Sequence, residues 1–190
     1  MSTAIRQILQ LKITLEHIEP PIWRRFQISN DIGLSDFHEA LQVIMGWENC
    51  HLHHFVTANT TIGIPDPDFE ELETVDETTV RLRDVLVNVG DSLQYEYDFG
   101  DGWAHRVDVE KVLSSTEVQS VPNCLDGARA CPPEDVGGPF GYLELLEAIA
   151  DTTHERHTEF VGWIGEDFAS GHFSVQEVNN ALLDISRRGA

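Results

Sequence analysis

The chain has 190 residues, with 33 acidic side chains against 12 basic ones and a formal net charge of −21 at pH 7. This length predicts one domain, residues 1–190, around a single core. A field of this sign repels phosphate backbones and anionic membrane surfaces, so direct non-specific nucleic-acid binding is disfavoured. Solubility, affinity for cations or for a basic protein partner, and adaptation to a salty cytoplasm are the open interpretations of the acidity.

The sequence gives no sign of export. No apolar run approaches the roughly 20 residues of a membrane span. Residues 1–10 lack the basic region, apolar stretch and cleavage site of a signal peptide. Three cysteines leave an odd thiol under any pairing, which is typical of a reducing compartment. We therefore expect a cytoplasmic protein without a membrane segment.

Two strands and a helix are predicted first. Leucine and isoleucine alternate with polar residues over 9–15, and alternation resumes over 22–28 after a turn that contains two prolines. These strands are expected to be antiparallel neighbours. An apolar stripe at helical spacing then predicts one helix near 35–46.

The middle of the chain is expected to be strand and loop, and its end helical. Residues 51–58 indicate a strand, and the acidic, proline-containing stretch 65–79 has no apolar period, which is typical of a surface loop. A helical period runs through much of 142–188. Strands first and helices last indicate an α+β fold with an antiparallel sheet.

A hairpin over 93–112 supplies the first candidate site. If Asp101 and Gly102 form a two-residue loop, Asp98 lies opposite His105 on one face of the sheet. A carboxylate there can orient the imidazole and fix its tautomer, as metal ligation and general-base catalysis require. A purely structural hydrogen bond would give the same pattern.

Two further histidines lie at the start of a strand. His51 and His53 share one strand face, from which two imidazoles can bind a single metal ion. Histidines in such a pattern are also common as hydrogen-bonded residues at a sheet edge. Cys124 and Cys131 are candidate zinc ligands with these histidines, although their spacing matches no common zinc motif and packed free thiols are the alternative.

The segment 131–142 combines three prolines, three glycines and the adjacent acids Glu134 and Asp135 before a predicted helix. It contains neither lysine nor arginine, so it is no phosphate-binding loop of the usual kind. Metal-bridged binding of an anion is one interpretation. A rigid structural turn packed under the hairpin is the other.

Four long motifs resemble those of the Ri-plasmid third-open-reading-frame-like family. They are PPIWRR at 20–25, GWENCHLH at 46–53, YDFGDGWAH at 97–105 and CLDGARACPPEDVGG at 124–138. The resemblance extends over roughly residues 8–185 and implies a compact α/β roll found on plasmids, on chromosomes and as a passenger of insertion sequences, with no established activity. His54 and the stretch 65–79 lie outside the motifs.

Three functions remain open. The first is an accessory binding domain of plasmid or mobile-element type, whose pocket would draw on His51, His53, Asp98, Asp101, His105, Cys124, Cys131, Glu134 and Asp135. The second is a metal-dependent hydrolase that holds a divalent transition ion such as zinc through His51, His53, Asp98 and His105. Asp101 or Glu134 would then act as the base. The third is a purely structural interaction module.

Overall fold

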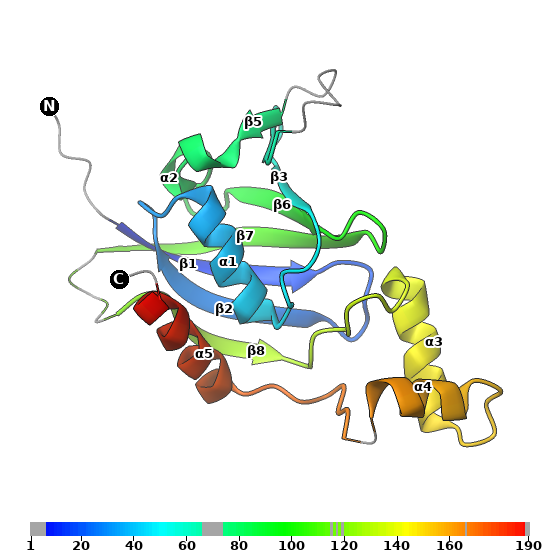
Figure 1. The fold of residues 1–190 in the computed structure, drawn as a ribbon. Helices are drawn as coiled ribbons and strands as arrows, with labels where there is room; N and C mark the ends of the chain where they lie inside the picture. Colours follow the sequence, from blue (N-terminus) through cyan, green and yellow to red (C-terminus); the bar gives the residue numbers. More distant parts are fainter. Residues whose placement is uncertain are drawn as a thin grey trace, which may run out of the picture.

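The computed structural model describes residues 7–65, 74–114, 116, 118, 120–165 and 167–188. Its strands are β1 Gln7–Leu15, β2 Ile22–Ser29, β3 His53–Val56, β4 Thr61–Gly63, β5 Thr74–Asp76, β6 Ser92–Tyr97, β7 Trp103–Ser114 and β8 Asn123–Ala128. Its helices are α1 Leu34–Met45, the 3-10 turn η2 Glu77–Thr79, α2 Leu82–Val85, α3 Gly138–Ala150, α4 His157–Ile164 and α5 Val175–Arg188. The expected α+β class is confirmed (Figure 1).

The eight strands form one sheet in the order β5-β4-β3-β6-β7-β1-β2-β8, and every neighbouring pair except β4–β5 is antiparallel. Helix α1 lies across one face of this sheet (Figure 1). Phe37, Leu41 and Ile44, the stripe that predicts α1, are fully buried. The core therefore lies between α1 and the central strands, and the alternating leucines of β1 point into it.

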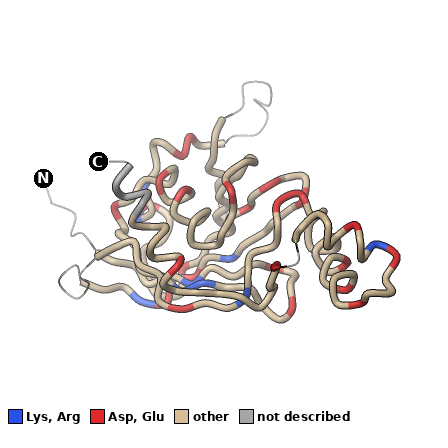
Figure 2. The backbone as a smooth tube through the Cα atoms, turned by 60° about the horizontal axis from the view of Figure 1, so that its bottom comes forward, with Lys and Arg blue, Asp and Glu red and all other residues tan. Residues whose placement is uncertain are grey.

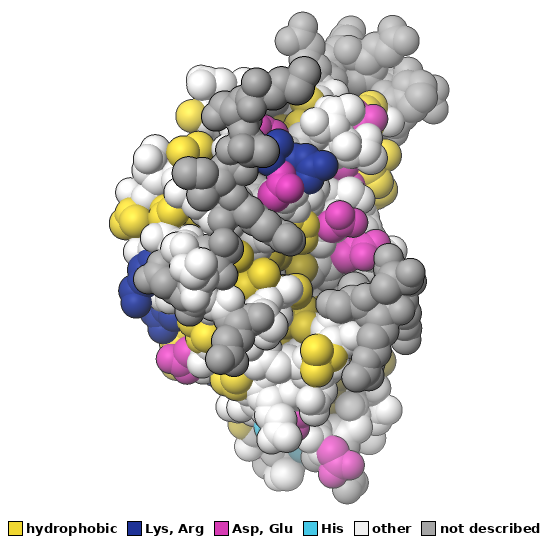
Figure 3. Space-filling view, turned by 90° about the vertical axis from the view of Figure 1, so that its left-hand side faces the viewer, with side chains coloured by type: hydrophobic (Ala, Val, Ile, Leu, Met, Phe, Trp, Pro, Cys, Tyr) yellow, Lys and Arg dark blue, Asp and Glu magenta, His cyan; other side chains and the backbone are white. Residues whose placement is uncertain are grey.

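The C-terminal helices occupy two places. Helix α5 packs against β8 and α1, whereas α3 and α4 pack against each other at one end of the sheet (Figure 1). Acidic positions run along most of the backbone and basic ones are few (Figure 2). The end of the molecule away from α3 and α4 carries hydrophobic side chains interspersed with small charged groups of both signs (Figure 3). In the described part of the chain no helix has the length and apolarity that crossing a membrane requires.

The hairpin forms, but its register differs from the expected one. Its loop has five residues, 98–102, so Tyr97 pairs with Trp103 and Tyr95 pairs with His105. Asp98 has a left-handed backbone, with φ of 55°, and its carbonyl accepts a hydrogen bond from the Gly102 N–H at 2.6 Å. Asp98 therefore belongs to the turn and not to the strand. The predicted pairing of Asp98 with His105 is wrong.

The acidic stretch is also more structured than expected. Of residues 65–79, those at 66–73 lie outside the described residues, whereas 74–79 form β5 and η2. Glu77 of η2 is buried and accepts a hydrogen bond from His53 Nε2 at 2.8 Å. The stretch is thus only in part a surface loop, because one of its acids has a buried histidine partner.

Candidate functional site

The candidate site lies where the segment before β3 meets the hairpin loop. Strand β3 pairs with β6 so that His53 is opposite Tyr97, and one step further the Asp98 N–H donates to the Leu52 carbonyl at 2.9 Å. This extension of the ladder places His51 beside Asp98. Their side chains face each other, with His51 Nε2 3.6 Å from Asp98 Oδ2.

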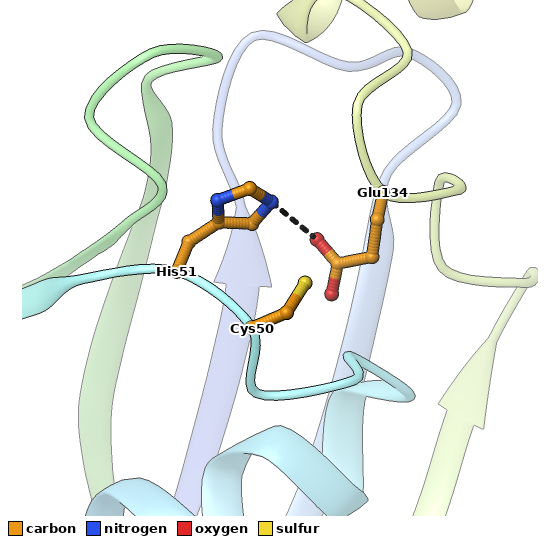
Figure 4. Close-up of side chains that lie close together, drawn as sticks. All are labelled: Cys50, His51 and Glu134. Carbon is orange, nitrogen blue, oxygen red and sulfur yellow. Dashed lines mark ion pairs between the residues drawn. The ribbon is translucent and has the colours of Figure 1, made fainter.

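Two carboxylates from the segment before α3 complete the cluster. His51 Nε2 lies 3.8 Å from Glu134 Oε2 and 3.3 Å from Asp135 Oδ1. Figure 4 shows the His51 ring and the Glu134 carboxylate pointing toward one another. Among the described side chains, four buried polar atoms have no hydrogen-bond partner: His51 Nε2 and Glu134 Oε2 in the cluster, and Trp103 Nε1 and the Tyr142 hydroxyl outside it. Such atoms are costly to bury unless they find a partner.

The buried carboxylates of Glu134 and Asp98 are each held by hydrogen bonds to the oxygen that does not face His51. Glu134 Oε1 accepts hydrogen bonds from the Glu48 N–H at 2.8 Å and the Tyr97 hydroxyl at 3.0 Å. Burial raises the pKa of Tyr97, so its hydroxyl stays protonated and donates. Asp98 Oδ1 accepts from the N–H groups of Gly100 and Asp101 at 3.0 and 3.3 Å. The remaining oxygen of each carboxylate is left facing His51.

Asp101 fixes the segment that carries Glu134 and Asp135. Its Oδ2 accepts a hydrogen bond from the Gly137 N–H at 3.0 Å, immediately before α3 begins. Gly138 has φ of +68°, and a Cβ at that position would lie 2.3 Å from the Asp101 carbonyl oxygen. Glycine is required there because the two loops touch through their backbones. Asp101 is therefore a positioning residue, and it lies outside the cluster of potential ligand atoms.

The cluster has a buried side and an exposed side. The side chains of Asp98 and Glu134 are 8% and 10% exposed, whereas that of Asp135 is 76% exposed. Cys50, an exposed free cysteine, lies next to His51, and the potential ligand atoms of Cys50, His51 and Glu134 all lie within 4.8 Å of one another. The same holds for His51, Asp98 and Asp135. Imidazole, carboxylate and thiol groups at these distances can hold one divalent cation.

His53 and His105 do not join the cluster. His53 is buried against Glu77, and His105 is fully buried with both ring nitrogens occupied. His105 Nε2 accepts from Trp47 Nε1 at 3.2 Å, and its Nδ1 donates to the Tyr95 carbonyl at 3.2 Å. Burial lowers the pKa of His105 to about 4, so the ring is neutral near pH 7. Of the expected metal ligands, the structure brings together only His51 and Asp98.

The cysteines of the third motif also lie elsewhere. Cys124 is buried in β8, where its N–H donates to Asn179 Oδ1 at 2.7 Å. Cys131 is a free thiol near the buried guanidinium of Arg24. Burial raises the pKa of both thiols, which keeps them protonated. Neither belongs to a group of potential ligand atoms among the described residues.

Sequence reasoning missed Cys50 and Tyr97. Cys50 directly precedes His51 inside the second motif, so its position in the Asn-Cys-His run is the signal that could have identified it. Tyr97 gave no local signal, because its role depends on reaching Glu134 across 37 positions of sequence.

Comparisons with known proteins place the chain among relatives. A family model described as plasmid pRiA4b ORF-3-like protein matches residues 7–177. A protein from Sinorhizobium fredii (strain NBRC 101917 / NGR234), named uncharacterized protein y4hQ, is 38% identical over 188 residues, which is 98% of this chain and 96% of the relative. The crystal structure of MM3350, a protein of unknown function from Methanosarcina mazei Go1, is similar with a TM-score of 0.83 and 35% identity, covering 92% of this chain and 98% of that one. Neither name states an activity.

Proposed function

The chain belongs to the family of plasmid pRiA4b ORF-3-like proteins, and for this member we propose a metal-binding function centred on His51, Asp98, Glu134 and Asp135. One observation carries the proposal. Two buried polar atoms without hydrogen-bond partners, His51 Nε2 and Glu134 Oε2, lie 3.8 Å apart, and Asp98 and Asp135 approach the same His51 nitrogen. A cation beside His51 Nε2 would give the imidazole a partner and would be held with it by carboxylates of one of the two triads that share His51.

The distances favour a metal over hydrogen bonds. His51 Nε2 is 3.3–3.8 Å from the three carboxylate oxygens, which is longer than an N–H···O bond of about 2.7–3.2 Å. Ligands that hold zinc tetrahedrally at about 2.0–2.2 Å are separated from one another by about 3.3–3.6 Å. The distances from His51 Nε2 to Asp98 and Asp135 fall in this range, and the distance to Glu134 is slightly longer.

The donor set favours a borderline transition ion. One imidazole with carboxylates and a thiol nearby suits zinc better than magnesium or calcium, which prefer oxygen ligands alone. We propose zinc as the reference ion. The free cysteines support a cytoplasmic location, and the family description supports an accessory protein of plasmid or mobile-element type. We propose that this protein holds its metal ion in the pocket around His51. The net charge of −21 supports a basic protein as its partner.

A metal-dependent hydrolase is the second candidate. It is supported by the exposed carboxylate of Asp135, which lines a cleft of about 230 Å³ at the edge of the cluster. Solvent and a small substrate would reach the ion from that side, and bound water at such an ion becomes a nucleophile near neutral pH. The two residues named from the sequence as general bases, Asp101 and Glu134, suit that role less well. Asp101 Oδ2 already accepts a hydrogen bond from the Gly137 N–H, and Glu134 would itself be a ligand of the ion.

Zinc titration of chelator-stripped, untagged protein tests the metal centre. We expect one ion per chain, and binding weaker by at least roughly 100-fold in His51→Ala. His54→Ala is a matched control, because the two side chains are 25% and 26% exposed and His54 instead pairs with Glu96 on the sheet. Absence of binding in the unmodified protein, or equal binding in His51→Ala, would refute the metal centre.

Hydrolysis is tested separately on the zinc-loaded protein with p-nitrophenyl esters and bis(p-nitrophenyl) phosphate. Turnover that depends on zinc and disappears in His51→Ala supports the hydrolase. Tight zinc binding with no turnover of either substrate would support the metal-binding function and would refute hydrolysis of carboxylic esters and phosphodiesters.

A further inference from the structure

Helices α3 and α4 form an acidic hairpin at one end of the molecule. Residues 134–165 contain seven acidic side chains and one basic one, Arg156. The backbone at that end is marked by acidic positions and a single basic one (Figure 2). The hairpin is closed by His157 Nδ1, which donates to the Ala148 carbonyl at 2.8 Å.

The positive charge of Arg156 is balanced by the carboxylates of Glu144 and Glu159. Its Nη1 donates to Glu144 Oε2 at 2.7 Å, and its Nε and Nη2 donate to the two oxygens of Glu159 at 3.0 and 2.6 Å. Its guanidinium also lies over the ring of Phe160, 4.1 Å from the ring centre. Because two carboxylates share this one cation, the hairpin keeps a net negative charge that no described basic residue of 134–165 balances.

The same hairpin exposes apolar side chains. Trp163 of α4 lines the cleft of about 230 Å³ together with Asp135, Arg156, Glu159 and Phe160. Phe140 and Leu143, three positions apart on α3, are large exposed hydrophobic residues. Exposed aromatic and aliphatic side chains among unbalanced carboxylates are the pattern of a surface that binds a basic, partly apolar segment.

We propose that the α3–α4 hairpin binds a lysine- or arginine-containing segment of a partner protein, with one cationic side chain in the cleft against Trp163. Charge complementarity identifies this occupant, because the excess of carboxylates attracts a cation. The indole is the aromatic ring that binds a cation best. Phe140 and Leu143 supply apolar contacts for the rest of the segment. The inference rests on α3 and α4, and it shares only Asp135 with the proposed metal centre, so the test is made without metal.

Fluorescence anisotropy with a labelled nine-residue peptide of alternating lysine and leucine tests the proposal, in the absence of metal and at physiological ionic strength. Trp163→Ala should weaken binding about tenfold, which corresponds to about 1.4 kcal/mol, because it removes both the aromatic–cation contact and the apolar area of the indole. Phe99→Ala, which removes an aromatic ring of similar exposure (52% against 48%) from the β6–β7 loop, should leave binding unchanged. Circular dichroism checks that each variant folds, and Trp163→Phe should retain part of the affinity.

Removing two charges at a time distinguishes peptide binding at the hairpin from attraction by the overall negative charge of the protein. Glu147→Gln with Glu155→Gln removes two exposed charges from the hairpin and should weaken binding several-fold. Glu19→Gln with Glu39→Gln removes two exposed charges elsewhere and should change it less than about twofold. Absence of peptide binding, equal effects of the two charge pairs, or an unaltered Trp163→Ala would overturn the proposal. Displacement of the peptide by equimolar spermine would instead assign the cleft to small polycations and likewise overturn it.

Discussion

The imidazole rings of His38 and His53 lie parallel, with their centres 3.4 Å apart and an interplanar angle of 1°. His38 comes from α1 and His53 from β3, so the stacked pair joins the helix to the sheet. His38 Nδ1 is 2.8 Å from the Tyr95 hydroxyl, and His38 Nε2 is 2.8 Å from Asn49 Oδ1. Since Asn49 stands two residues before His51, this buried network supports the segment that leads into the candidate site.

Stability should decrease as the pH falls from 6.5. Burial, and then the neighbouring His53, lowers the pKa of His38 from 6.5 to about 4, and burial lowers that of His105 to about 4 as well. Between these values the unfolded chain binds protons that the folded chain does not, so the free energy of unfolding falls by up to about 1.4 kcal/mol per pH unit for each histidine. Urea denaturation at pH 7, 6 and 5 measures this. His105→Gln should make the dependence shallower, and a flat profile from pH 7 to 5 would contradict the assignment.

The buried hydrogen bond between His53 and Glu77 should contribute more to the free energy of unfolding than its partly exposed counterpart between His54 and Glu96. Glu77→Ala leaves His53 Nε2 without its partner in the core, and we expect a loss of about 1–3 kcal/mol in the free energy of unfolding. Glu96→Ala breaks a similar pair with His54, at 2.9 Å instead of 2.8 Å, where both side chains are partly exposed. The loss there should stay below about 1 kcal/mol. Equal losses of unfolding free energy in the two variants, measured by urea denaturation, would show that burial does not determine how much such a pair stabilises the fold.

Local patterns predicted much of the fold because its main elements are governed by periodicity. The alternation of Leu9 to Leu15 gave β1, and the apolar stripe through Phe37 gave α1. The hairpin was predicted, but its register was not, because the left-handed backbone of Asp98 lengthens the turn to five residues. That difference moved His105 from the expected pair with Asp98 into the core beside Trp47.

The candidate site could be predicted only in part, since distant segments assemble it. His51, Asp98, Glu134 and Asp135 could all be named from the sequence, but their convergence depends on the β3–β6 register and on the contact of Asp101 with Gly137. Neither relationship has a local sequence signal. Whether the assembled residues bind a metal remains a prediction.

Gly138→Ala should disturb the site through the backbone. The new Cβ would meet the Asp101 carbonyl oxygen at 2.3 Å in a backbone conformation that alanine rarely adopts, so the loop must move. We expect a loss of roughly 1–3 kcal/mol in stability and weaker zinc binding, because Glu134 and Asp135 move with the loop. Gly162→Ala in α4 is the control: nothing lies within 4 Å of its added Cβ, and stability should stay equal or rise by up to about 1 kcal/mol. Unchanged zinc affinity in Gly138→Ala would separate the loop from the metal centre.

Cys50 should determine whether the metal centre prefers thiolate-binding ions such as zinc over ions such as manganese that prefer oxygen ligands. Its exposed thiol lies within 4.8 Å of the potential ligand atoms of His51 and Glu134, so an ion bound there can recruit it as a thiolate. We expect the cobalt-substituted protein to show a thiolate-to-metal charge-transfer band in the near ultraviolet. Cys50→Ser should lose this band and shift the preference from zinc toward manganese, because only nitrogen and oxygen ligands then remain. Cys131→Ser should keep the band, since that thiol is outside the cluster and burial holds its pKa high. If the band survives in Cys50→Ser, or never forms, Cys50 is not a ligand and the centre consists of the imidazole and carboxylates alone.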